Sequence, residues 1–319
     1  MKQLIAVTGA TGFIGQSVCR RLLARGYAVR ALVRPRHRVL PDALTQVEMI
    51  HGHLADTASL RHLTSGADAI IHCAGRVRGA TPAQFDQVNV EGTRNVLHAA
   101  KSCQTVPRLL FVSSLAAREP QLSYYASSKY RAEQLLEREG NNIDWTVLRP
   151  PAVYGPGDRE LLPLLRLMAR GIAFIPGLPT ARFSMLYVED FSTAVIAWLH
   201  CTGAKAKVFS VDDGHDNGYD WHEMSDIVGD LCGRKIRIVQ ITPWLLDRAV
   251  RINSLVSKLF DSSPMLTPEK LRELRHHDWV SDDAAFQQLT GWQPQTDLAS
   301  GLAETPDWPG YCCGKSQLP

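Results

Sequence analysis

The sequence predicts an α/β fold, in which a doubly wound parallel sheet is joined to a smaller α/β C-terminal domain. Short β-branched, apolar runs alternate with helical patterns through the first half of the 319-residue chain. The runs are apolar on consecutive residues, as strands buried on both faces of a parallel sheet are. The alternation of strands with helices then implies right-handed βαβ units.

The elements of the first half follow in order. Strands are expected over residues 4–7, 28–33, 47–50, 69–72, 109–112 and 145–148. Helices are expected over residues 15–25, 58–63, 90–102 and 127–139. After Tyr154 the pattern loosens, and we expect a helix over residues 190–200, a strand over 208–211 and an amphipathic helix over 244–260.

The composition excludes several classes of protein. Lys and Arg number 35 and Asp and Glu number 32, which gives a formal net charge of +3. This charge is too small to indicate a nucleic acid or an anionic membrane as a partner. The seven cysteines have no CxxC spacing, and no apolar stretch approaches roughly 18 residues. We therefore expect free thiols, no metal site, no integral membrane segment and a cytoplasmic location.

A glycine-rich turn, Thr-Gly-Ala-Thr-Gly-Phe-Ile-Gly over residues 8–15, lies between the first strand and the first helix. Gly9 allows a tight turn, Gly12 lets the backbone approach a pyrophosphate, and Gly15 lets the helix pack closely on the sheet. The helix N-terminus offers free N–H groups and a positive dipole to the phosphates. The turn therefore predicts a dinucleotide-binding domain of the Rossmann type.

The end of the second strand bears on the choice of dinucleotide. Arg34 stands where an NAD-binding unit usually has Asp or Glu for the ribose hydroxyls. A carboxylate would repel a 2′-phosphate, whereas a guanidinium can hold it in bidentate geometry. We predict that NADP(H) is the preferred cofactor, and NAD(H) is the alternative.

Tyr125 and Lys129 form a candidate pair for proton transfer. They stand at i and i+4, which puts them one turn apart on the same face of a helix. A phenol with a pKa of about 10 is a poor acid or base at neutral pH, but a neighbouring ammonium stabilises the phenolate. Ser113 and Ser114 end the fifth strand, and a hydroxyl there can donate to a substrate oxygen. We choose Ser114, because successive strand residues face opposite sides.

These motifs resemble those of an extended short-chain dehydrogenase/reductase of the NAD(P)-dependent epimerase/dehydratase family. The pattern is most similar to members of the 3β-hydroxysteroid dehydrogenase and dihydroflavonol reductase type. The matching segments follow the family's order along most of the chain: residues 8–15, 52–56, 71–75, 89–93, 111–114, 125–129, 148–157, 187–190 and 291–294.

The resemblance implies that Ser114, Tyr125 and Lys129 are catalytic. It also implies a set of cofactor-binding residues: Gly9, Thr11, Gly12, Phe13 and Ile14 along the diphosphate, Arg34 at the adenosine ribose, His53 and Leu54 at the adenine, Ala74 and Gly75 beside the ribose and diphosphate, Tyr125 and Lys129 at the nicotinamide ribose, and Pro150 and Val153 beside the nicotinamide. His53 stands where the family usually has Asp, so an imidazole takes the place of the carboxylate that accepts from the adenine amino group.

Two departures from the family pattern concern the substrate. Ala152 stands where sugar-nucleotide members usually have Asn, and Phe183 stands where they usually have an Arg for the pyrophosphate. Arg182 is adjacent, but a slip of one residue on a strand points to the other face. The losses favour a less charged, more apolar substrate. The alternative is that a sugar nucleotide is held by other residues, such as Arg159, Arg166 or Arg182.

The sequence leaves three functions open. The first is an NAD(P)-dependent oxidoreductase that interconverts a hydroxyl and a ketone on a mostly apolar, steroid-like small molecule. The second is a nucleotide-sugar epimerase or dehydratase that returns the hydride to its substrate. The third is a catalytically silent cofactor sensor, against which the intact set of Ser114, Tyr125 and Lys129 argues.

We expect residues 1–155 to form the dinucleotide-binding domain, with residues 183–211 returning to it. Residues 156–182 and 212–319 are expected to form the substrate-binding domain. The segment 244–260 has few basic residues, which favours a role over the substrate site or on the core rather than on a membrane surface. The family resemblance suggests a homodimer in which the helices over residues 90–102 and 127–139 pair with their copies.

Overall fold

The computed structural model describes residues 2–35, 44–242 and 267–305, together with Trp244, Leu246 and Arg248. The chain divides into two compact units. Among the described residues, the first unit is drawn from Met1–Pro150, Phe191–Val211 and Asp283–Trp292. The second is drawn from Pro151–Asp190, Asp212–Asp282 and Gln293–Pro319.

A seven-stranded sheet forms the centre of the first unit, in the order β3-β2-β1-β4-β5-β6-β11. Every neighbouring pair in it is parallel. The strands are β1 (Leu4–Thr8), β2 (Ala28–Val33), β3 (Glu48–His51), β4 (Ala69–His72), β5 (Arg108–Val112), β6 (Trp145–Arg149) and β11 (Lys207–Ser210). The strand order reverses between β1 and β4, so the loops that follow these two strands meet at the carboxyl edge, where such sheets bind ligands.

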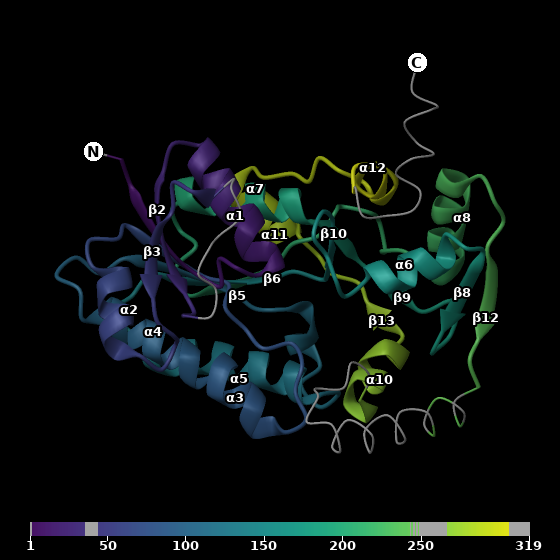
Figure 1. Cartoon of the computed structure of the whole chain (residues 1–319), viewed down its shortest axis with the longest axis horizontal. Coiled ribbons are helices and arrows are strands. Elements are labelled where there is room, and N and C mark those ends of the chain that lie inside the picture. Colours follow the sequence, from purple (N-terminus) through teal and green to yellow (C-terminus); the bar gives the residue numbers. More distant parts are fainter. Residues whose placement is uncertain are drawn as a thin grey trace. The chain divides into compact units, whose positions relative to one another are not determined.

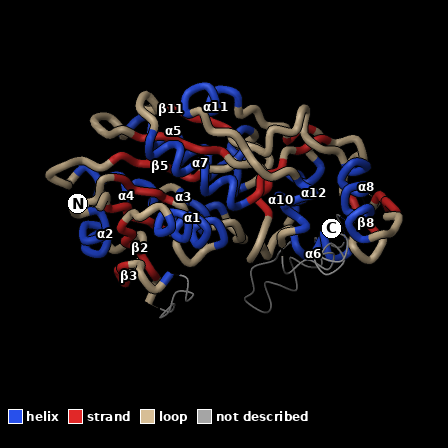
Figure 2. Tube along the Cα trace, turned by 90° about the horizontal axis from the view of Figure 1, so that it is seen from above, coloured by secondary structure: helices blue, strands red, loops and turns tan. Residues whose placement is uncertain are grey.

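Helices cover both faces of this sheet. Figure 1 draws α1, α7 and α11 on one side of it and α2, α3, α4 and α5 on the other. Their bounds are α1 (Phe13–Ala24), α2 (Thr57–Thr64), α3 (Pro82–Asn89), α4 (Glu91–Lys101), the 3-10 turn η2 (Leu115–Arg118), α5 (Tyr124–Glu139), α7 (Val188–His200) and α11 (Ala284–Thr290). The predicted doubly wound fold is confirmed, and the strand and helix layers can be followed in Figure 2.

The core of the first unit shows why the strands are apolar throughout. Ile70, Leu109 and Val147 on neighbouring strands are fully buried, and they pack in one cluster with Val96 and Leu136 from the helices. A strand covered by helices on both faces has no solvent side, so polar alternation is absent from it.

Two helices differ from the prediction. The helix α5 begins at Tyr124 rather than at residue 127, because the Ser123 side chain accepts a hydrogen bond from the N–H of Ala126. The helix α3 was not predicted. The Thr81 side chain caps it, and Pro82 occupies its first turn, where a missing N–H costs nothing.

Residues 283–292, which we expected in the substrate domain, pack with the first unit. The ring of Phe286 lies 5.6 Å from that of Phe209 on β11 and 5.7 Å from that of Trp292. The Trp292 indole donates to Thr193 Oγ1 of α7 at 2.9 Å. Aromatic burial therefore holds this segment in the first unit. Conversely, residues 183–190 belong to the second unit.

The second unit contains three two-stranded parallel sheets and four helices in its described residues. The strand pairs are β7 (Ala152–Tyr154) with β10 (Met185–Tyr187), β8 (Ile172–Ile175) with β12 (Arg237–Gln240), and β9 (Arg182–Phe183) with β13 (Asp278–Trp279). The helices are α6 (Leu162–Met168), α8 (Trp221–Cys232), α10 (Pro268–Arg275) and α12 (Leu298–Ala303). Tyr154, Met185 and Tyr219 are buried at the centre of the unit's core.

Some expectations concern residues outside this description. The predicted helix 244–260 falls there, apart from Trp244, Leu246 and Arg248, and so do Cys312 and Cys313, two of the seven cysteines that we expect to be free thiols. The five described cysteines, Cys19, Cys73, Cys103, Cys201 and Cys232, are free thiols. None of the described helices combines the length and the apolarity that are needed to cross a bilayer.

The packing of Phe286 yields a stability prediction. Replacing this fully buried side chain in Phe286→Ala removes its contacts with two aromatic rings and is expected to cost about 3–5 kcal/mol in the free energy of unfolding. Phe174→Ala is the matched control, because Phe174 is 41% exposed, and it should cost less than about 1 kcal/mol. Urea unfolding measures both. Equal losses would contradict the assignment of residues 283–292 to the core of the first unit.

Candidate active site

Two glycines of the turn between β1 and α1 lie so close to neighbouring backbone that no side chain would fit there. Gly9 has a φ of +78°, which favours glycine, and a Cβ there would lie 2.6 Å from the backbone nitrogen of Ala74 after β4. A Cβ on Gly15 would collide with the Gly9 carbonyl. Gly12 is the N-cap of α1, is exposed and provides no side-chain cap. The first N–H groups of α1 are thus suited to the diphosphate of a dinucleotide.

The other predicted dinucleotide residues of the first unit lie at the ends of its strands. Arg34 is exposed directly after β2, and His53 is exposed shortly after β3. Leu54 packs against α4, where a Cβ on Gly92 would lie 2.6 Å from its Cδ1. The remaining members, Thr11, Phe13 and Ile14 in the glycine turn and Ala74 and Gly75 after β4, stand at the carboxyl edge. The basic residues 36–38 are outside the described residues.

Lys129 is buried at the end of β5. Its Nζ donates to the Val112 carbonyl at 2.8 Å and lies 4.7 Å from the centre of the Phe111 ring. A Cβ on Gly75 would lie 3.3 Å from the same Nζ, which shows how near the amine is to the loop after β4. Burial lowers the pKa of Lys129 to about 8, although the Glu133 carboxylate acts in the opposite direction.

Tyr125 lies in the first turn of α5, one helical turn before Lys129. It is half-buried, and its ring centre is 6.5 Å from that of Phe85 in α3. Its backbone carbonyl accepts from the Ser128 hydroxyl at 2.7 Å, and this hydroxyl in turn accepts from Asn89 Nδ2 at 2.8 Å. The beginning of α5 is therefore tied to the end of α3.

Asn89 was part of a family motif, but we predicted no role for it. It is buried, and its amide makes two hydrogen bonds with the backbone of Arg76, at 2.7 and 3.0 Å. Together with its bond to Ser128, these contacts connect the loop after β4 to α5. The signal in the sequence was only an asparagine directly before the helix predicted over residues 90–102, and its partners are 13 and 39 residues away.

The two serines that follow β5 have different partners. The Ser113 hydroxyl donates to the buried carboxylate of Glu133, which also forms a bidentate ion pair with Arg149. Ser114 is the N-cap of η2, and its Oγ accepts from the N–H of Ala116 at 3.2 Å. The Ser113 hydroxyl is thus used in a structural network, whereas the Ser114 hydroxyl can still donate.

Pro150 and Val153 lie in different units. Pro150 is buried in the first unit, and its carbonyl accepts from the N–H of Leu115 at 2.8 Å. Val153 is half-buried on β7 in the second unit, next to Ala152.

Phe183 and Arg182 form β9 in the second unit and have separate environments. The Phe183 ring lies 5.0 Å from the Trp221 ring of α8. The Arg182 guanidinium donates to the carbonyls of Asn217 and Gly218, at 2.6 and 2.7 Å. The arginine is therefore engaged by backbone, and the position that sugar-nucleotide members use for a pyrophosphate is aromatic here.

A fully buried histidine, His72, connects three segments of the first unit. Its Nδ1 lies 2.6 Å from Thr8 Oγ1, and its Nε2 lies 3.0 Å from Thr93 Oγ1. The Thr93 hydroxyl donates to the Asn89 carbonyl, so it must accept from Nε2–H. The Thr8 hydroxyl accepts from the N–H of Ala74 and donates to Nδ1. These bonds assign the neutral Nε2–H tautomer, and burial lowers the pKa of His72 to about 3.

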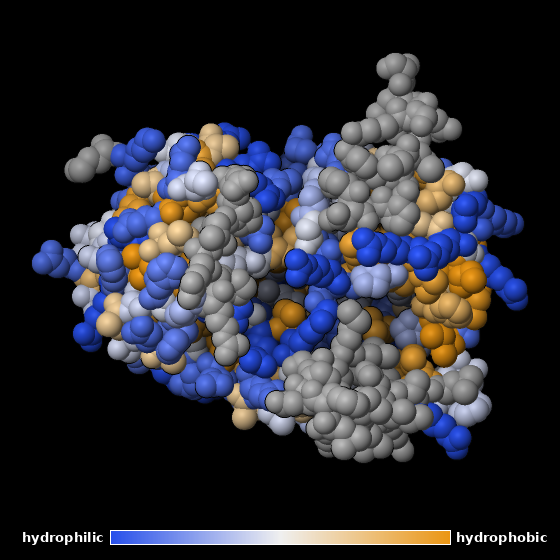
Figure 3. Space-filling view, in the orientation of Figure 1, coloured by the Kyte–Doolittle hydropathy of each residue, from blue (hydrophilic) through white to orange (hydrophobic). Residues whose placement is uncertain are grey.

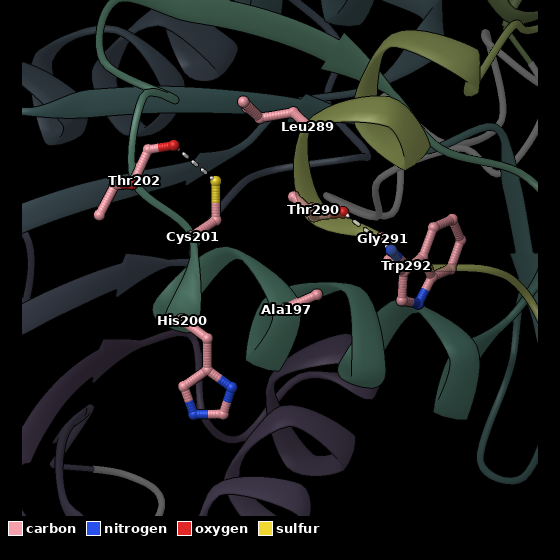
Figure 4. Close-up of a pocket in the computed structure, with 8 residues that line it drawn as sticks. All are labelled: Ala197, His200, Cys201, Thr202, Leu289, Thr290, Gly291 and Trp292. Carbon is pink, nitrogen blue, oxygen red and sulfur yellow. Dashed lines mark hydrogen bonds between the residues drawn. The ribbon is translucent and has the colours of Figure 1, made fainter.

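An open pocket of about 450 Å³ lies at the opposite edge of the sheet (Figure 4). It is lined by the ends of α7 and α11, including His200, Cys201 and Trp292. The Tyr27 hydroxyl before β2 lies 2.9 Å from His200 Nε2, which places the pocket at the amino ends of the strands. Burial raises the pKa of Cys201, so the thiol is not a reactive thiolate. We assign the pocket no catalytic role.

No group of three or more His, Cys, Asp or Glu side chains is arranged to hold a metal ion within residues 2–35, 44–242 and 267–305.

Comparisons with known proteins give relatives and a fold. The model of the NAD dependent epimerase/dehydratase family matches residues 5–211. The chain is 34% identical to a ceramide reductase of Caulobacter vibrioides over 96% of this chain and 94% of that protein. It is 27% identical to a 2-alkyl-3-oxoalkanoate reductase of Stenotrophomonas maltophilia over 93% and 97% of the two chains. A UDP-glucose 4-epimerase of Thermotoga maritima, solved with UDP-glucose, has a TM-score of 0.76 at 20% identity, over 98% and 100% of the chains, and shows the shared fold.

The environment of His72 predicts a pH-dependent contribution to stability. Its pKa is about 3 in the fold and about 6.5 in an unfolded chain. Between these values only the unfolded chain takes up the proton, so stability that is present above pH of about 6.5 is lost as the pH falls toward 3. Between pH 7 and pH 5, the free energy of unfolding of His72→Gln should therefore fall by about 2 kcal/mol less than that of the wild type, as measured by urea unfolding.

His51→Gln is the control, because His51 is exposed at the end of β3. It should retain the pH dependence of the wild type. The same pH dependence in His72→Gln would show that His72 is not buried in its neutral form.

Proposed function

Because this chain belongs to the NAD-dependent epimerase/dehydratase family, we propose that it interconverts a hydroxyl and a ketone on a mostly apolar small molecule by net hydride transfer. The relatives make it an NAD(P)-dependent oxidoreductase of the extended short-chain type. The observation that carries the finer proposal is the buried amine of Lys129 at the end of β5, one helical turn from Tyr125 and beside a strand end with a free hydroxyl donor on Ser114.

Each of the three residues has one role in this proposal. Tyr125 transfers the proton to or from the substrate oxygen. Lys129, with a pKa of about 8, is an ammonium at neutral pH and stabilises the phenolate. Ser114 donates to the substrate oxygen and orients it. The nicotinamide, when bound, supplies or accepts the hydride.

We assign the dinucleotide to the first unit and propose NADP(H) as the preferred cofactor. Its binding residues are those that the resemblance implies there: Gly9, Thr11, Gly12, Phe13, Ile14, Arg34, His53, Leu54, Ala74, Gly75, Tyr125, Lys129 and Pro150. The close approach of Gly9 to Ala74 and the uncapped N-terminus of α1 support this assignment. The exposed guanidinium of Arg34 after β2 supports the choice of NADP(H), because a guanidinium can bind the 2′-phosphate.

We assign substrate binding to the second unit, together with Val153 at the nicotinamide. Two features support an apolar substrate. The Phe183 ring packs on Trp221, and the neighbouring Arg182 is engaged by backbone carbonyls. The two relatives named above are reductases of ceramide and of 2-alkyl-3-oxoalkanoates. We also propose a cytoplasmic homodimer in which α4 and α5 pair with their copies.

The second candidate is a nucleotide-sugar epimerase or dehydratase, in which the hydride returns to the substrate. The family model and the fold shared with a UDP-glucose 4-epimerase favour it. The aromatic Phe183 counts against it, because a diphosphate needs a cationic partner. Only the first candidate function changes the net oxidation state of the nicotinamide.

The first test is turnover of a panel of long-chain and steroid-like ketones, followed by nicotinamide absorbance. The wild type should oxidise NADPH, and Tyr125→Phe should lower kcat by roughly 10²- to 10⁴-fold because the proton donor is lost. Ser114→Ala should lower kcat more than Ser113→Ala, which removes a structural hydrogen bond to Glu133. Turnover of sugar nucleotides alone, without net absorbance change, would favour the second candidate, and a larger loss in Ser113→Ala would reverse the choice of serine.

The second test concerns the cofactor. Arg34→Ala should weaken NADPH binding by roughly 10- to 100-fold, because a charge-assisted hydrogen bond to the 2′-phosphate is lost, and should change NADH binding little. Arg61→Ala, an exposed arginine of α2, is the control. Fluorescence titration measures the affinities. Tighter binding of NADH than of NADPH by the wild type would show that the assignment is wrong.

A further inference from the structure

The two-stranded sheet of β8 and β12 has one apolar face toward solvent. Along β8 buried and exposed residues alternate, and Ile172 and Phe174 are 37% and 41% exposed. In the parallel register, Ile172 stands opposite Arg237 and Phe174 stands opposite Val239. Residues opposite one another share a face of the sheet. We call the three apolar side chains, Ile172, Phe174 and Val239, the β8–β12 face.

More apolar surface continues beyond the ends of these strands. Leu178 is 55% exposed after β8, Trp244 is 55% exposed after β12, and Leu274 is 39% exposed on α10. The segment after β8 lies against the end of α10, because a Cβ on Gly177 would be 3.3 Å from the Cα of Arg275. Figure 3 shows hydrophobic surface over the place where Figure 1 draws β8 and β12. Exposed apolar side chains that gather in this way indicate an interaction site.

Four cations border the β8–β12 face at the beginning of both strands. Arg170 precedes β8, Arg234 and Lys235 precede β12, and Arg237 is its first residue; all four are exposed. Parallel strands begin at the same edge, and Arg234 Cδ would lie 3.9 Å from a Cβ on Gly171. Within the described part of the chain, none of the four makes an ion pair. Their charge is therefore available to an external anion.

We propose that the β8–β12 face and its four bordering cations bind the surface of an anionic phospholipid bilayer. The exposed Ile172, Phe174 and Trp244 would enter the boundary between headgroups and acyl chains, and the cations would meet lipid phosphates. A partner with only negative charge would leave the apolar face unused, and an uncharged apolar partner would leave four cations without an ion pair. The small net charge of +3 does not oppose this, since surface attraction falls off within a Debye length and depends on the local cluster.

This inference goes beyond the proposed reaction and does not need it, because lipid binding is measured without turnover. Were both correct, the surface would bring the enzyme to the phase in which apolar substrates partition. Failure of the wild type to bind vesicles, together with intact ketone reduction, would overturn only the inference. Vesicle binding without any reduction would overturn only the proposed function.

The experiment is co-sedimentation of the full chain with vesicles of phosphatidylcholine alone or mixed with phosphatidylglycerol. Binding to the phosphatidylglycerol vesicles is expected, and it should weaken as salt is raised. The triple variant Arg234→Gln, Lys235→Gln, Arg237→Gln should bind roughly 100-fold more weakly, at about five-fold for each cation. The double variant Ile172→Ser, Phe174→Ser should also lose binding.

Matched controls come from exposed residues of the first unit. Arg25→Gln, Arg61→Gln, Lys205→Gln removes the same charge, and Met49→Ser, Val106→Ser removes exposed apolar side chains that are 38% and 41% exposed. Both should bind vesicles nearly as the wild type does. All variants should keep the NADPH affinity and the urea midpoint of the wild type, which excludes misfolding.

Three outcomes would overturn the proposal. The wild type could fail to bind phosphatidylglycerol vesicles. The charge control could lose as much binding as the β8–β12 triple variant, which would indicate nonspecific attraction. The double variant could change the oligomeric state in sedimentation equilibrium and leave vesicle binding unaltered, which would assign the face to a second copy of the chain.

Discussion

The hydrogen-bond chain through His72 determines where the candidate residues of the first unit lie. It begins at Ala74, passes through Thr8, His72 and Thr93 and ends at the Asn89 carbonyl, so it joins β1, β4, α4 and the end of α3. The glycine turn directly follows Thr8, and the loop that approaches Lys129 directly follows Ala74. Each polar atom of the chain has a partner, which lets a neutral imidazole be buried without an unsatisfied donor or acceptor.

The charge on Lys129 depends on a second buried group. Burial favours loss of the proton from the Lys129 amine, because it disfavours the ammonium. The carboxylate of Glu133, one turn further along α5, opposes that loss and is itself held by Arg149 and Ser113. The ion pair between Glu133 and Arg149 thus gains a hydrogen bond from Ser113, and a buried ion pair is stable only when such additional hydrogen bonds satisfy it. The same network explains why the two adjacent serines differ in what they can donate to.

In the second unit, Phe183 occupies the position at which the family resemblance implies a cationic partner for a pyrophosphate, and the adjacent Arg182 is bound by backbone carbonyls. Arg182 is taken up by the loop at Asn217, and Phe183 is paired with Trp221. Its outer sheet of β8 and β12, in contrast, leaves cations and apolar side chains unused by the fold. An apolar substrate and an amphipathic outer surface are chemically compatible with one another, because both belong at a lipid interface.

The amino-acid sequence by itself determined the parallel sheet, the glycine turn and the Tyr125–Lys129 spacing, because continuous burial, tight turns and helical periodicity are local properties. It did not reveal α3, the packing of residues 283–292, the partners of Asn89 or the β8–β12 face. These depend on contacts between residues far apart in the chain and on the register of short strands, which carry little periodic signal. Only the tertiary structure could therefore decide which serine keeps a free donor and which apolar side chains remain in water.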